Sequence, residues 1–133
     1  MAKIASLLAR SLRILRVIDP DENPEPEQYE RAMLALNEMM ASPKWLNMPL
    51  GWVAVDNPDD DTPLPDRAIR AVAYALAVEL RPEYGASLDP DVEMRADMAF
   101  SELLSARLKE SPPILSLDDL PTPEAYRNAG YTG

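Results

Sequence analysis

Prolines divide this chain into the segments that helices can occupy, and their spacing constrains the fold more than any other feature of the sequence. The residue before a proline avoids the α region, whereas proline itself is accepted in the first turn of a helix. Pro20 and Pro43 therefore predict two helix ends, and Pro24 or Pro26 together with Pro90 predict two helix starts. The chain has 133 residues and 14 prolines, which suits one domain.

Apolar residues recur at helical spacing in four of these intervals. A helix over about residues 4–18 has an apolar half and a basic half. Further helices are predicted over about residues 24–42, over about residues 65–81, and from Pro90 to a point before Pro112. Either Pro82 ends the third of these helices or Gly85 caps its last turn. Asp89 has the right side chain for the N-cap of the fourth.

The predicted fold is all-α, an antiparallel bundle of about four helices. A protruding loop or short β-hairpin, at about residues 43–64, separates the second helix from the third. The helical domain covers residues 1–110, and residues 111–133 form an extended C-terminal tail with no sustained periodicity. The tail suits a segment that orders on a partner, or else a frayed terminus. Its apolar residues are Ile114, Leu115, Leu117, Leu120, Tyr126 and Tyr131.

Composition excludes several functions. Histidine and cysteine are both absent, which removes the usual general base, the thiolate metal site and any disulfide framework. The net charge of −10 argues against a basic surface that wraps nucleic acid. No apolar run approaches the roughly 20 residues of a membrane span. Paired carboxylates are plentiful, so they are weak evidence for glycan hydrolysis, and no other catalytic motif is present. We therefore expect no enzyme and no cofactor.

Charge is distributed unevenly along the first two helices. Residues 1–18 carry four basic residues and no acid, whereas residues 19–30 carry six acids. Arg10, Arg13 and Arg16 would form a basic helix face that packs against an acidic face of a neighbouring copy. The alternative is two ordinary solvated faces.

The stretch "LGWVAVDNPDDDTPLP" at residues 50–65 is long and acidic for a connection within a compact domain, so it is either a functional loop or a solvated linker. It fails the calcium-loop pattern in every frame, because no frame combines the oxygen ligands with glycine at position 6 and glutamate at position 12. Trp45 and Trp52 either close the bundle over the loop or, for residues 52–55, form one strand of a protruding hairpin. The second alternative predicts contacts between copies through Trp52, Val53, Val55, Asp59, Asp60 and Asp61.

Ordered features of the chain resemble a family of structural virus proteins. "LLARSLRILRVI" precedes an acidic, proline-containing turn, and "YERAMLALNEMMASPKWL" ends in a Met-Met-Ala turn before a tryptophan. "GWVAVDNPDDDTPLPDRAIRAVAYALAVELRPEYG" has an aromatic-aliphatic strand, an acidic loop, an alanine-rich helix and a Pro-Glu-Tyr turn. This pattern, over residues 1–108, resembles the head-to-tail adaptor (connector) proteins of tailed bacteriophages. It is most similar to the packaged-DNA stabilisation, or tail accessory, proteins of short-tailed phages.

The resemblance implies a virion protein of the head-tail junction that is assembled in the host cytoplasm. It implies a ring, commonly of twelve copies, beneath the portal protein. Such a ring extends the DNA channel without sequence-specific binding, retains the packaged genome and provides a docking site for the next tail component. The C-terminal tail would dock on the portal. Two rival functions remain open from the residues: a small acidic helical interaction module, and a carboxylate-based cell-wall glycan hydrolase.

Overall fold

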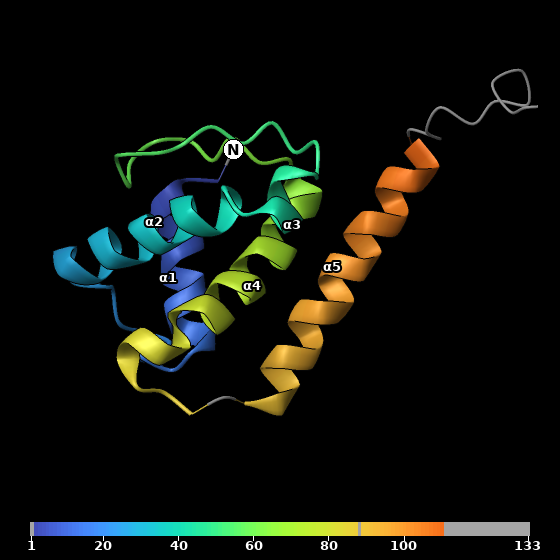
Figure 1. The fold of residues 1–133 in the computed structure, drawn as a ribbon. Coiled ribbons are helices and arrows are strands. Elements are labelled where there is room, and N and C mark those ends of the chain that lie inside the picture. Colours follow the sequence, from blue (N-terminus) through green and yellow to red (C-terminus); the bar gives the residue numbers. More distant parts are fainter. Residues whose placement is uncertain (1, 88, 111–133) are drawn as a thin grey trace, which may run out of the picture. The chain divides into compact units, whose positions relative to one another are not determined.

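The computed structural model describes residues 2–87 and 89–110 and contains five helices in that part of the chain (Figure 1). They are α1 (Ile4–Ile14), α2 (Pro26–Met40), α3 (Pro43–Leu46), α4 (Asp66–Tyr84) and α5 (Pro90–Glu110). No β-strand occurs among these residues, and the predicted all-α fold is confirmed. Residues up to Leu103 form one compact unit and Leu104 begins another, so the predicted domain boundary at residue 110 stays a prediction.

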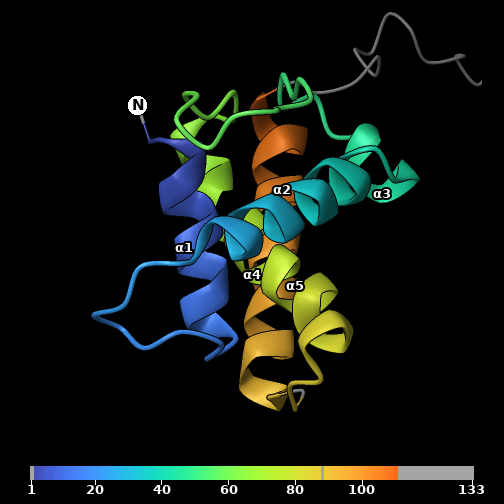
Figure 2. The same ribbon diagram turned by 90° about the vertical axis from the view of Figure 1, so that its left-hand side faces the viewer.

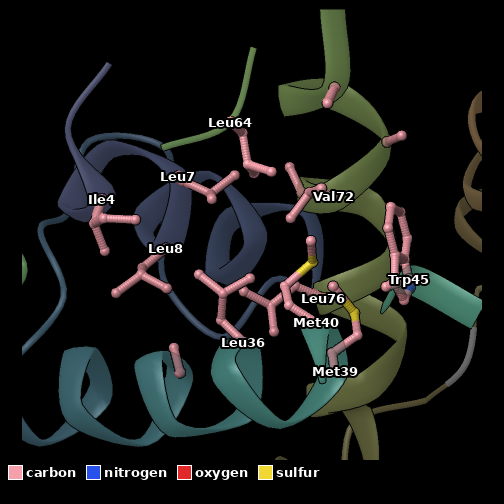
Figure 3. Packing of buried hydrophobic residues seen from close by; sticks show 14 of the residues in the cluster. Ile4, Leu7, Leu8, Leu36, Met39, Met40, Trp45, Leu64, Val72 and Leu76 are labelled. Atoms are coloured by element: carbon pink, nitrogen blue, oxygen red, sulfur yellow. The ribbon is translucent and has the colours of Figure 1, made fainter. Parts of the chain in front are cut away.

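The core lies where α1, α2 and α4 meet (Figures 2 and 3). The apolar half of α1 is buried there, as its periodicity predicts. The alanines of α4 have small side chains, so α1 and α2 can pack close to this helix. Ser11 is fully buried and its hydroxyl donates to the carbonyl oxygen of Ala73 at 2.9 Å, which joins α1 to α4. The largest fully buried apolar side chains are Ile4, Leu7, Leu8, Leu12, Leu36, Met40, Val72, Leu76 and Leu80.

Helices α1 and α4 run in the same direction. Ser11 meets Ala73, and one turn further on Ile14 lines a groove together with Ala77. This pair therefore departs from the predicted antiparallel arrangement. The reason is the long connection before α4, whose residues 58–62 bind residues 2–5 through backbone hydrogen bonds. That contact brings the chain back to the end where α1 begins, so α4 must start there too.

Helix α1 ends at Ile14, four residues before the predicted end at Ile18. Arg16 adopts a left-handed conformation with φ 63°. The Val17 N–H then bonds the Leu12 carbonyl and the Arg16 N–H bonds the Arg13 carbonyl, both at 3.0 Å. These two bonds form a Schellman motif, which terminates a helix without proline. The left-handed position usually holds glycine, which is why the sequence pattern did not reveal it.

Other helix ends lie close to their predicted positions. Pro26 stands at the first position of α2, as one of the two predicted alternatives, and Glu25 and Gln28 form a capping box there that was not predicted. Gly85 closes α4 with φ 61°, so the second of the two predicted alternatives holds and Pro82 lies inside the last turn. The Asp89 carboxylate accepts a hydrogen bond from the Asp91 N–H at 2.9 Å, as expected of an N-cap.

The short helix α3 was not predicted, because Pro43 was interpreted only as the end of the preceding helix. It stands at the first position of α3, where proline is well accepted. Trp45 of this helix is buried, and its ring meets Phe100 of α5 edge to face, with centroids 4.9 Å apart. The Lys44 ammonium lies 4.2 Å from the Phe100 centroid. Trp45 therefore closes the core, which is one of the two alternatives that were predicted for the tryptophans.

Candidate functional site

The connection between α3 and α4, residues 47–65 and called the loop below, is extended and lies on the helices (Figure 1). Asn37 of α2 holds its middle. The Asn37 side chain donates to the Val55 carbonyl oxygen at 2.7 Å and accepts from the Val55 N–H at 3.0 Å. By pairing with both backbone polar groups of Val55, the side-chain amide replaces the hydrogen bonds that a neighbouring strand would form. Asn37 was not predicted as a contact residue. Its signal in the sequence is a poor helix former in the middle of a helix, beside the buried Leu36.

The acidic part of the loop covers the N-terminal end of α1. The first N–H groups of a helix have no partner within the helix. Here the Ile4 N–H bonds the Asp60 carbonyl at 2.9 Å and the Ala5 N–H bonds the Pro58 carbonyl at 2.8 Å. The Thr62 N–H bonds the Ala2 carbonyl at 2.8 Å. The loop therefore supplies the N-terminal cap that Lys3, at the N-cap position, does not supply with its own side chain.

Charge supports the same contact. Aspartates at a helix N-terminus are favourable because that end carries a partial positive charge. Lys3 and Asp61 form an ion pair at 2.9 Å. The hydrogen bond between the two side chains lowers the pKa of Asp61 and raises the pKa of Lys3. Both side chains are more than half exposed, so the pair adds little stability.

The predicted contact residues of the loop have different environments. Val53 is 67% exposed, whereas Val55 is buried under the Asn37 contact and Trp52 is half-buried against the core. Asp59 and Asp60 are exposed. The loop forms no hairpin in the described residues, which have only an isolated bridge between Lys3 and Asp61. The aromatic-aliphatic run therefore has one inward-facing valine and one outward-facing valine.

The three arginines of the predicted basic face do not act alike. Arg10 and Arg16 are exposed. Arg13 is half-buried and its guanidinium donates to the Glu22 carbonyl oxygen at 3.1 Å, which ties α1 to the turn that follows it. Arg10 and Arg16 are thus the members of the set that are available at the surface.

A groove of about 490 Å³ lies at the end of the body opposite the loop. It is lined by Ile14, Leu15, Ala77, Val78, Pro90 and Val92, with Arg16 and Asp89 also at its walls. The lining is mostly aliphatic, because the early end of α1 leaves Ile14 and Leu15 only half-buried. Sequence periodicity assigned these two residues to the core, so it did not reveal a groove.

The described residues contain no group of three or more acidic side chains placed to hold a metal ion. Burial raises the pKa of Tyr84. The Arg31 guanidinium lies 5.4 Å from the centroid of the Tyr84 ring. Tyr84 does not line the groove. No helix in the part of the chain that the structure describes is long and apolar enough to cross a membrane.

The six apolar residues predicted to dock the tail lie outside the described residues, so their role stays a prediction. They are Ile114, Leu115, Leu117, Leu120, Tyr126 and Tyr131.

Comparison with protein families gives a match over most of the chain. The family model described as P22 tail accessory factor matches residues 19–131. No curated protein matches the chain. The matched range begins in the turn after α1, includes the loop, α4 and α5, and continues through most of the tail.

Proposed function

Because this chain belongs to the P22 tail accessory factor family, we propose that it is the head-to-tail adaptor of a tailed bacteriophage. A tail accessory factor is a structural, virion-associated protein, and this role does not involve catalysis. The proposed adaptor forms a ring, of about twelve copies by the family resemblance, beneath the portal protein. It extends the DNA channel, retains the packaged DNA and offers a surface to the next tail protein. Assembly takes place in the host cytoplasm and the mature site is the head-tail junction.

The observation that carries this proposal is the extent of the family match. It covers the helical body from the turn after α1 onwards and also residues 111–131. The tail is therefore part of the family pattern and not an appendage peculiar to this chain. Its aliphatic and aromatic residues, spaced by prolines, suit an extended segment that orders on a protein surface. The portal is the proposed surface.

Charge agrees with a channel protein. A net charge of −10 repels the phosphate backbone, so DNA can slide past without being held, whereas a basic wall would bind it. Neighbouring copies are proposed to meet through the exposed Arg10 and Arg16 on one side and the acidic loop on the other. Such a head-to-tail contact is heterologous, and it closes into a ring when the rotation between copies allows.

The test is native mass spectrometry of the full chain, alone and mixed with the portal protein of the same phage. The expected result is a complex of the portal ring with about a dozen copies of this chain, whether or not a ring forms alone. A monomer that does not bind the portal would contradict the adaptor function. It would favour a small acidic helical interaction module instead.

Truncation after Glu110 tests the tail separately. We expect the truncated chain to keep the helical signal and thermal midpoint of the full chain while its binding to the portal is lost. A suitable control is a full-length chain with Ser116→Ala, which keeps every apolar residue of the tail. Unchanged portal binding after truncation would show that the tail is not the docking element.

A further inference from the structure

The groove at the end of α1 is an apolar surface that nothing in the described residues covers. Its floor is aliphatic and its volume of about 490 Å³ admits more than one side chain. Arg16 and Asp89 lie at its walls. The Asp89 carboxylate accepts the Asp91 N–H at the start of α5, whereas Arg16 is exposed just beyond the end of α1. Aliphatic surface beside an exposed positive charge suits an apolar side chain that has an acidic neighbour.

The loop of the same chain has that chemistry. We call residues 52–56 the arm. Val53 at its centre is 67% exposed, although the contact of an aliphatic side chain with water is unfavourable in free energy. Asp56 at its end is exposed too. Leu46 of α3 is similarly exposed, at 70%, but the charged residue nearest to it in the sequence is Lys44 instead of an acid.

The arm is held in place before any partner arrives. Asn37 binds both backbone polar groups of Val55, which fixes the arm at its buried residue. An extended segment fixed in this way can present the exposed Val53 side chain to a partner. Little conformational entropy remains to be lost when such a segment binds.

The arm and the groove cannot meet within one copy. The loop binds the N-terminal end of α1 (Figure 1), whereas Ile14 and Leu15, which line the groove, lie at the other end of that helix. Two complementary surfaces at opposite ends of one body produce a heterologous contact between copies.

We propose that the arm of one copy binds in the groove of the next, with Val53 between the aliphatic residues of the groove and Asp56 beside Arg16. This inference rests on the proposed ring and supplies the contact that joins its subunits. The occupant of the groove is a second copy of this chain.

Cysteine cross-linking tests the contact directly, since the chain has no cysteine of its own. Full-length Val53→Cys protein is mixed with isotope-labelled Val92→Cys protein and oxidised. We expect labelled–unlabelled dimers to form several-fold faster than in the control mixture of Leu46→Cys with Val92→Cys. Leu46 is matched to Val53, since it is 70% exposed and equally aliphatic. Equal rates for the two mixtures would overturn the proposal.

Charge exchange tests the orientation. Arg16→Glu in the groove copy, or Asp56→Arg in the arm copy, should each slow the cross-link several-fold, and the two together should restore it. Arg16→Gly is a second loss variant that suits the left-handed backbone and so keeps the protein folded. The exposed Arg70→Glu is the control and should change nothing. A rate indifferent to these charges would contradict the proposed contact.

The outcome is separable from that of the proposed function. Rings on the portal without the Val53–Val92 cross-link would overturn this contact and leave the adaptor function standing. The cross-link without portal binding would keep the contact and remove the adaptor function. A Val92→Cys chain that instead cross-links to Ile114→Cys would assign the groove to the tail and overturn the proposal.

Discussion

The loop and helix α5 show that regular secondary structure and firm attachment are different properties. The loop has no helix or strand, yet Leu50, Val55, Thr62 and Leu64 are all buried, and hydrogen bonds hold it at Val55 and at residues 58–62. Up to Leu103, α5 is a regular helix attached through the buried Ala96, Ala99 and Leu103 and one aromatic pair. Met94 and Met98 on its outer side are 53% exposed. A segment is held by what it buries and bonds, and not by its own regularity.

The largest expected effect comes from the loop. Leu64 is 3% exposed within the main core, so Leu64→Ala should lower the free energy of unfolding by about 2–4 kcal/mol through lost burial and a residual cavity. Leu34→Ala is the matched control, since Leu34 is 61% exposed, and should change it by less than about 0.5 kcal/mol. Urea unfolding measures both. Similar small effects for the two variants would mean that the loop is not part of the core.

Next in size is the Asn37 contact. Asn37→Ala leaves the N–H and carbonyl of Val55 without their partner and should cost about 1–3 kcal/mol. Amide hydrogen exchange at Val55 should become much faster, while exchange in α4 scales only with global stability. Asn37→Asp keeps the acceptor and loses the donor, so protection of the Val55 N–H should fall less. Unchanged exchange at Val55 in both variants would contradict the assigned role of Asn37.

The aromatic pair measures how firmly α5 is attached. Phe100→Ala removes the edge-to-face contact with Trp45 and the nearby Lys44 charge, and should cost about 1–2 kcal/mol because Phe100 is only half-buried. Tryptophan fluorescence should change, since Trp45 becomes accessible to quenchers. Met98→Ala on the exposed side should alter neither signal. A loss as large as that of Leu64→Ala would remove the contrast between the two regions.

The smallest effect belongs to the Lys3–Asp61 pair. The pKa of Asp61 is lowered in the folded state, so its stabilisation is present above the unfolded pKa, ordinarily 3.8, and is lost as pH falls through the folded value. The pKa of Lys3 is raised, so its part is lost as the solution becomes strongly alkaline. Thermal midpoints of the native chain and Asp61→Asn should differ slightly at pH 7 and converge near pH 2. The difference at pH 7 should shrink in high salt. A gap that persists at pH 2 would show another role for Asp61.

The helices were largely predictable because their signals are local. Apolar spacing and the residues Gly85 and Asp89 determine most of the bounds of α2, α4 and α5. The end of α1 was not predictable, since Arg16 occupies a backbone conformation that glycine ordinarily signals. Asn37, the direction of α4 and the groove depend on segments far apart in the chain. The sequence therefore predicted contacts between copies through both Val53 and Val55, but it could not tell which of the two side chains faces the core.

The cap of α1 has a consequence for the order in which the protein folds. The carbonyls of Pro58 and Asp60 complete a turn that begins at Ile4, more than fifty residues earlier in synthesis. During translation the first helix emerges without its cap, and its first turn frays until the loop has left the ribosome and α4 begins to form. Closure of that long chain segment is slow compared with helix growth. We expect the first turn of α1 to be among the last structures to gain protection from exchange in pulse-labelling during refolding, although it comes first in the chain.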